Sequence, residues 1–150
     1  MNIFKDGALN LNGNTLRASA IMPYYTIAVG NGEKVGSAYN SYLISNILRE
    51  KYQYDGVLCT DWGITGDAFA IDVFFSGKSF GVENLTVAER HYKALMSGMD
   101  QFGGNNDMIP VLDAFKIGIE KYGEDFMRRR FEESAIRLLK NIFNVGLDLI

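Results

Sequence analysis

The chain has 150 residues, 47% of them hydrophobic, and a formal net charge of −3 at pH 7. That size and composition are typical of one globular domain or part of one, and the small negative charge excludes the electrostatic attraction that nucleic-acid binding needs. A single Cys and a single His exclude an internal disulfide and a His/Cys zinc cage, no apolar run is long enough to cross a membrane, and no cofactor or metal site is indicated.

The first predicted elements are a strand and a helix. Residues 18–22 have the apolar pattern of a short strand, which Pro23 ends because proline has no N–H for the next ladder bond. After a loop rich in Gly and Asn (residues 30–36), a helix is expected from about Ala38 to Tyr52. Its apolar residues fall on one face, namely Leu43, Ile44, Ile47 and Leu48.

The next strand, Val57 to Thr60, leads directly into a candidate active-site turn. Asp61 and Trp62 follow this strand and precede Gly63. A parallel strand that ends in this way places a carboxylate beside a flat aromatic surface, at the edge of the sheet where loops build active sites. A long loop with aromatic residues then continues to Gly81, and loops of that length are more often functional than idle.

The second half of the chain is predicted to be mainly helical. Thr86-Val87-Ala88-Glu89 has the pattern of a capping box, which opens a helix that continues to Met96. Gly98 suits the position just past its end. Residues 99–102 have the pattern of one more short strand.

Two further helices complete the predicted order. Pro110 suits the first turn of a helix that Gly123 stops, and a final helix is expected over residues 124–144. Strands that alternate with helices imply a parallel sheet, either an open doubly wound sheet or part of a β/α barrel. A complete barrel needs eight strands in about 250 residues, so this chain is too short for one. The doubly wound binding domain predicts a G-x-G-x-x-G loop, and Gly30 to Gly36 lacks that spacing.

Three motifs follow one another along the chain: Met22-Pro23-Tyr24-Tyr25, the segment Leu48 to Val57, and Cys59-Thr60-Asp61-Trp62-Gly63. In this order they resemble the second half of the catalytic barrel of family 3 glycoside hydrolases. The resemblance continues through Ser97-Gly98-Met99-Asp100 to the closing segment Arg137 to Leu147. It implies an α/β fold over residues 1–150, a partial (β/α) TIM-type barrel with roughly the last three strands and their helices. The first barrel half and the C-terminal sandwich domain of that family would be missing.

The resemblance implies that Asp61 is the catalytic nucleophile, although an Asp after a strand can also simply cap the turn. A retaining glycosidase uses one carboxylate to attack the anomeric carbon, and a second carboxyl group about 5–5.5 Å away as acid and base. Trp62 is expected in the sugar-binding wall, because an indole face complements a pyranose ring, with core packing as the alternative. Tyr25 matches a family tyrosine that can hydrogen-bond to the nucleophile. Tyr24 is the outward-facing alternative, and packing remains open for both tyrosines.

The remaining polar residues are predicted to have structural roles. His91 is expected at a solvated helix position, Cys59 as a small buried hydrophobe, and Asp100 as a structural hydrogen-bonding residue. Turn chemistry explains Asn105-Asn106-Asp107 as well as substrate contact does. Arg128-Arg129-Arg130 is expected to be a solvated helix face.

These patterns lead to the expectation of a fragment of a retaining β-glycosidase that acts on terminal β-linked sugars, with glucose or xylose as the sugar. The expected partners are a carbohydrate substrate and a second copy through open sheet edges, with no nucleic acid and no membrane. The general acid/base has no candidate here, because in most family members the following domain provides it. A catalytically inactive remnant or interaction module is the alternative. The parent is expected to be secreted or periplasmic, although residues 1–6 lack the order of a signal peptide.

Overall fold

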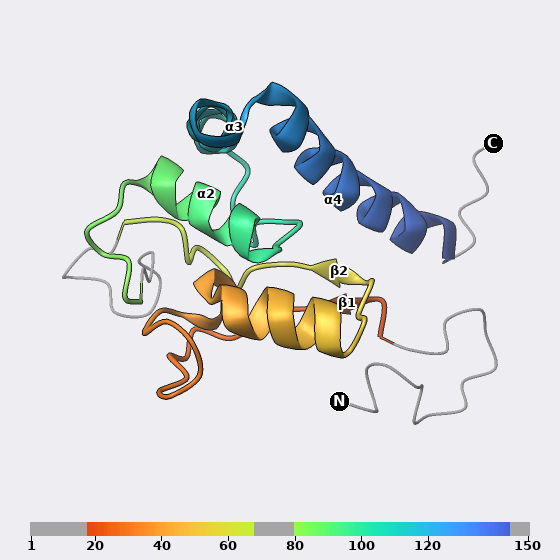
Figure 1. The fold of residues 1–150 in the computed structure, drawn as a ribbon, viewed down its shortest axis with the longest axis horizontal. Coiled ribbons are helices and arrows are strands. Elements are labelled where there is room, and N and C mark those ends of the chain that lie inside the picture. Colours follow the sequence, from red (N-terminus) through yellow and green to blue (C-terminus); the bar gives the residue numbers. More distant parts are fainter. Residues whose placement is uncertain (1–17, 68–79, 145–150) are drawn as a thin grey trace.

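The structure is a computed structural model that describes residues 18–67 and 80–144 (Figure 1). The predicted polar lead at residues 6–14, the loop aromatics Phe74 and Phe75, and the closing residues 145–147 lie outside the described residues.

A pair of parallel strands carries the candidate site. β1 (Ala20–Ile21) pairs with β2 (Val57–Leu58) in the register that sets Ala20 opposite Val57. Both predicted strands are therefore present and parallel, but shorter than the apolar pattern suggested. The third predicted strand, at 99–102, is reduced to a parallel bridge between Cys59 and Gln101.

The helix predicted from about Ala38 to Tyr52 is confirmed only in part, because two elements occupy this segment. A 3₁₀ turn, η1 (Ser37–Tyr39), precedes a π-helix, η2 (Tyr42–Lys51). Asn40 between them has an extended backbone, and its side-chain amide donates to the carbonyl of Asn31 at 2.7 Å. An Asn side chain that bonds to the local backbone competes with helical pairing, which explains the interruption.

The apolar face predicted for this segment is confirmed. Ile44 and Leu48 are buried, whereas Leu43 and Ile47 are partly buried. The face packs into a core whose buried members are Val35, Ala38, Tyr39, Ile44, Leu48, Tyr54, Leu58, Ile64, Val82, Ala94 and Met99.

Helix α2 (Val87–Ser97) has both ends that its sequence predicts. Thr86 accepts from the N–H of Glu89 at 3.2 Å, and the Glu89 carboxylate accepts from the N–H of Thr86 at 2.8 Å. Gly98 ends the helix with φ of +115°, a left-handed conformation that glycine adopts without strain.

Helices α3 (Ile109–Tyr122) and α4 (Glu124–Asn144) follow α2 in the chain (Figure 1). Pro110 lies in the first turn of α3 and Gly123 follows its end, as predicted. The two helices approach closely at Gly118, where a Cβ would lie 2.8 Å from Cγ of Met127. None of the helices in the described ranges combines the length and the hydropathy that a bilayer-spanning helix requires.

Asp100 connects α4 to the strands through a buried carboxylate, so its predicted structural role is confirmed. Its side chain has no exposed area, and it accepts from the N–H of Leu58 at 3.0 Å and from Ser134 Oγ at 2.7 Å. Arg49 Nη2 and Arg137 Nη1 also donate to this carboxylate, at 2.7 and 2.8 Å.

The solvated face predicted for Arg128-Arg129-Arg130 is wrong at Arg130. Arg128 and Arg129 are exposed, but Arg130 is only 9% exposed. Its guanidinium donates to the carbonyl oxygens of Leu95 and Met99 at 3.0 and 2.6 Å. Burial lowers the pKa of Arg130, and the charge of Asp100 opposes that shift. The buried carboxylate explains why an arginine is accommodated there.

The described residues therefore form a small, helix-rich α/β unit with one parallel strand pair and two isolated bridges, Cys59–Gln101 and Ile27–Gly36. The partial barrel stays a prediction.

Candidate active site

Hydrogen bonds on both sides hold the Asp61-Trp62 dipeptide in place. Before it, the N–H of Thr60 donates to the carbonyl of Gln101 at 2.9 Å, and Thr60 Oγ1 accepts from the N–H of Gly103 at 2.8 Å. After it, the N–H of Gly63 donates to the carbonyl of Gly103 at 3.0 Å. The turn that follows β2 is thus attached along its length to the 101–103 segment.

The carboxylate of Asp61 lies in a sheltered position at this turn. Asp61 is 8% exposed, and its Oδ1 accepts from the N–H of Trp62 at 2.7 Å. Tyr25 reaches the same turn from the residues after β1, and its phenol donates to the carbonyl of Trp62 at 2.7 Å. Burial raises the pKa of Tyr25, and the charge and hydrogen bonding of Asp61 raise it further. The fold therefore brings Tyr25 and Asp61 together.

Tyr24 and Tyr25 differ in orientation, as alternation along an extended chain predicts. Tyr24 is 66% exposed, whereas Tyr25 is partly buried. Their rings meet edge to face with centroids 5.5 Å apart. Of the two alternatives, Tyr25 is the residue beside Asp61.

Trp62 is exposed, so the alternative of core packing does not describe it. The residue is 64% exposed, and its indole lies against the backbone of Gly103 and Gly104. An exposed aromatic surface beside a sheltered carboxylate is the arrangement that the sequence predicts. Whether a sugar binds there stays a prediction.

The solvated position predicted for His91 is wrong, because its side chain is fully buried. Nδ1 lies 2.8 Å from the carbonyl oxygen of Val87, and Nε2 lies 3.2 Å from Thr65 Oγ1 and 2.7 Å from Asn105 Nδ2. Burial lowers the pKa of His91. The polar neighbours of His91 in the sequence suggested solvent, but its spacing of four residues from both Val87 and Leu95 indicates the inner face of α2.

Two other predictions about polar residues hold in part. Cys59 is partly buried, and burial followed by the charge of Asp61 raises the pKa of its thiol, which disfavours a reactive thiolate. Turn chemistry is confirmed after Gly104, because Asn105 Oδ1 accepts from the N–H of Asp107 at 2.8 Å. Asp107 Oδ1 in turn accepts from the N–H of Ile109, the first residue of α3, at 2.9 Å.

The sequence patterns did not single out Gly103 and Gly104, which lie against the Trp62 indole. The signal available in the sequence was that two glycines are adjacent in a loop.

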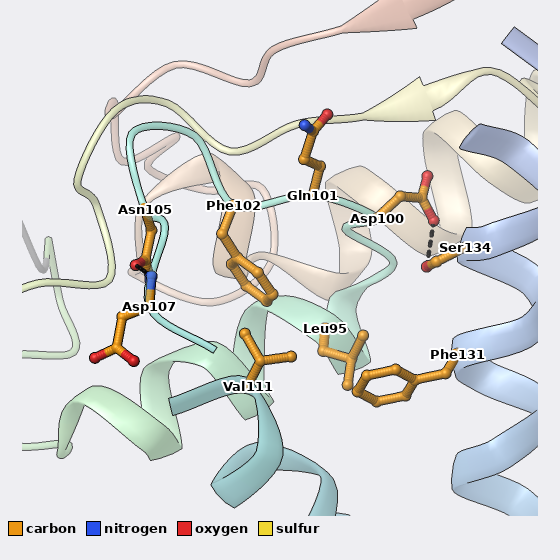
Figure 2. A pocket seen from close by; sticks show the side chains of 9 residues that line it. All are labelled: Leu95, Asp100, Gln101, Phe102, Asn105, Asp107, Val111, Phe131 and Ser134. Atoms are coloured by element: carbon orange, nitrogen blue, oxygen red, sulfur yellow. Dashed lines mark hydrogen bonds between the residues drawn. The ribbon is translucent and has the colours of Figure 1, made fainter. Parts of the chain in front are cut away.

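A pocket of about 240 Å³ lies on the helix side of the 100–107 segment (Figure 2). Its lining residues are Leu95, Asp100, Gln101, Phe102, Asn105, Asp107, Val111, Phe131 and Ser134. Figure 2 shows Asp100 and Ser134 joined by their hydrogen bond at one end and apolar side chains between the helices. None of Tyr25, Asp61 and Trp62 lines it, so this pocket is separate from the candidate site. Among the described residues, no group of three or more His, Cys, Asp or Glu side chains is arranged to hold a metal ion.

Comparison with known proteins relates the chain to sugar-cleaving enzymes. No family model matches it. It is 35% identical over 131 residues to probable β-glucosidase C of Aspergillus oryzae and 34% identical to β-glucosidase C of Emericella nidulans, with 87% of the chain covered in each case. It is 36% identical over 146 residues to a periplasmic β-glucosidase/β-xylosidase of Dickeya chrysanthemi. The chain spans about a fifth of the length of these relatives, 20% to 21%.

Solved structures show the same fold at low sequence identity. Zinc-bound CbsA from Thermotoga neapolitana matches 86% of the chain with a TM-score of 0.61 and 19% identity, and the match covers 25% of that protein. A fungal multi-domain GH3 β-N-acetylglucosaminidase matches 88% of the chain with a TM-score of 0.59 and 18% identity, over 14% of its own length.

Proposed function

The chain is related to family 3 glycoside hydrolases of the β-glucosidase type along 87% of its length, and from this relationship we propose that it is the nucleophile-bearing segment of a retaining β-glycosidase. The observation that carries the proposal is the meeting of Tyr25 and Asp61-Trp62 beyond the carboxyl ends of two parallel strands. In β/α folds, active sites lie at that edge.

Each of the three side chains has a defined task in this proposal. The Asp61 carboxylate attacks the anomeric carbon, the glycosidic oxygen leaves, and a glycosyl ester forms that water later hydrolyses. Trp62 stacks on the sugar through its exposed indole face. Tyr25 orients the turn through its hydrogen bond to the Trp62 carbonyl. Protonation of the leaving group requires a carboxylic acid from a segment beyond this chain.

The proposed substrate is a terminal β-linked glucose or xylose. The relatives are named β-glucosidase and β-glucosidase/β-xylosidase, and those names support this choice. Because the chain spans about a fifth of those relatives, residues 1–150 are proposed to be part of the barrel domain, without its first half and without the following sandwich domain.

A chimera tests the nucleophile. The chain replaces the matching segment of the Dickeya chrysanthemi enzyme, and an aryl β-glucoside and β-xyloside serve as substrates. Asp61→Asn keeps an oxygen that can accept from the Trp62 N–H but removes the nucleophile, so turnover should fall by at least about a thousandfold. A 2-deoxy-2-fluoro glucoside, which slows breakdown of the ester, should label the peptide that contains Asp61.

The matched control is Asp107→Asn, at an exposed carboxylate whose hydrogen bond to the Ile109 N–H an Asn side chain can retain. Its turnover should stay close to that of the chimera. Labelling of a carboxylate other than Asp61, or full turnover by Asp61→Asn, would refute the assignment.

The second candidate is a remnant or interaction module without turnover of its own. Without a general acid and half of the sugar contacts, the isolated chain should show no measurable turnover, because protonation and positioning are both lost. Aryl glycosides with good leaving groups are the fairest substrates, since they need little acid assistance. Turnover that Asp61→Ala abolishes would show that the missing segments are dispensable.

A further inference from the structure

We propose that Gly103 and Gly104 are positioning residues that hold the indole of Trp62 flat, so that its outer face meets a sugar ring bound at Asp61. The inference rests on the proposed function. It goes beyond the role of the nucleophile, because it names the residues that fix the orientation of the sugar-stacking side chain.

The first observation is the absence of space between the indole and the glycine backbone. A Cβ on Gly104 would lie 2.6 Å from Cδ1 and 2.9 Å from Cγ of Trp62. A Cβ on Gly103 would lie 2.9 Å from Cε3 and 3.2 Å from Cζ3. The five-membered ring therefore lies against Gly104 and the six-membered ring against Gly103. A side chain at Gly104 must displace the indole.

The second observation is that the opposite side of the indole is open. Trp62 is 64% exposed although one side of its ring rests on the glycine backbone. Tryptophan usually buries its large apolar surface. An indole that packs against backbone on one side and stays exposed therefore provides a surface on which a ligand can stack.

The third observation is that the support and the indole belong to one hydrogen-bonded unit. Gly103 donates to Thr60 Oγ1 and accepts from the N–H of Gly63, at 2.8 and 3.0 Å. Tyr25, from the segment that follows β1, donates to the carbonyl of Trp62 at 2.7 Å. A surface held in place before binding loses little entropy when the sugar arrives, so the arrangement favours affinity.

Substitution at Gly104 separates the steric effect from backbone strain. Gly104 has φ of +68°, so Gly104→Ala introduces both strain and the clash with Trp62. Gly104→Asn introduces the clash with less strain, because Asn tolerates this conformation. The matched control is Gly30→Ala, where φ is +83° and nothing lies within 4 Å of the added Cβ.

The test uses the chimera described above. In the chimera, Gly104→Asn and Gly104→Ala should raise KM for the aryl β-glucoside by roughly three- to tenfold with little change in kcat, because stacking is lost and the nucleophile is kept. Gly30→Ala should leave KM unchanged.

A double-mutant cycle with Trp62→Ala completes the test. Once the indole is absent, Gly104→Asn should have no further effect on KM, since the two residues act through one contact. Unchanged KM in both Gly104 variants, or an equal rise in the Trp62→Ala background, would overturn the positioning role even if Asp61 proves essential. Full activity of Asp61→Asn would instead refute the proposed function, so the two failures are distinguishable.

Discussion

At the scale of single residues, the neutral form of His91 holds two loops together. A carbonyl oxygen can only accept, so the contact with Val87 places the hydrogen on Nδ1. Nε2 then accepts from the Thr65 hydroxyl and the Asn105 amide. These contacts connect the loop after Asp61 to the loop after Gly104. Protonation of Nε2 would replace an acceptor by a donor and break the contact with the Asn105 amide, whereas the Thr65 hydroxyl could reverse its role and accept.

This arrangement predicts acid destabilisation through His91. Burial lowers its pKa in the folded state, the Asp107 charge and the Val87 hydrogen bond oppose that shift, and Arg90 adds to it. The unfolded state, with a pKa of about 6.5, therefore binds more protons below that pH, and stability present at neutral pH is lost as the pH falls. Between pH 6.5 and 5.5, the uptake of one proton can lower the free energy of unfolding by at most about 1.4 kcal/mol.

Urea unfolding of the chimera at pH 7.5 and 5.5 measures this loss. His91→Gln offers an acceptor near the position of Nε2 but does not titrate, so its unfolding free energy should depend less on pH than that of the wild type. Equal pH dependence in the two proteins would show that His91 is not the group responsible.

At the scale of elements, Asp100 joins parts of the chain that local sequence does not connect. Its buried carboxylate binds the backbone of β2, Arg49 from η2 and Arg137 from α4. Removal of one partner from a buried ion pair leaves the remaining charges uncompensated, which costs more than the pair contributed. The contact between α4 and the strand that leads to Asp61 therefore depends on this carboxylate.

Asp100→Asn should lower the free energy of unfolding by about 3–5 kcal/mol, because the buried arginines lose their counter-charge. Circular dichroism during thermal and urea unfolding of the chimera measures the loss. The matched control is Asp113→Asn on α3, whose partner Lys116 is 71% exposed, and which should cost at most about 1 kcal/mol. Similar losses in the two variants would contradict the central role of Asp100.

At the scale of the whole molecule, the described residues leave a strand edge and an apolar helix face exposed. Among the described residues, β1 pairs with β2 alone and its other edge has no partner strand, whereas the 100–101 segment bonds to the other edge of β2. Helix α4 also exposes apolar side chains, namely Ile136, Leu139, Ile142 and Phe143. The relatives are about five times longer than the matched segment, and the remaining length is available to cover such surfaces.

The isolated chain should therefore dimerise, aggregate or fold only in part. A domain's net stability is about 5–15 kcal/mol, so loss of the contacts from half a core can exceed it. Light scattering over a range of concentrations, combined with a thermal melt, measures both effects. A monodisperse monomer with a sharp, cooperative transition would show that the chain is a self-sufficient domain.

The sequence by itself determined the features that depend on neighbouring residues. The capping box at Thr86, the left-handed Gly98 and the end of α3 at Gly123 follow from local backbone chemistry, and all three are confirmed. The motifs likewise sufficed for the resemblance to family 3 glycoside hydrolases, and the relatives that the chain matches are named β-glucosidase and β-glucosidase/β-xylosidase. Asp61 was a candidate for the same reason, since its motif is a continuous segment.

Only the tertiary structure decided which distant segments meet. Tyr25 and Trp62 are 37 positions apart and share a hydrogen bond, and the indole of Trp62 rests on a glycine pair that no local pattern connects to it. His91 and Arg130 are buried because loops and a carboxylate from elsewhere in the chain cover them. Burial depends on which segments pack together, and the pattern of one helix does not contain that information.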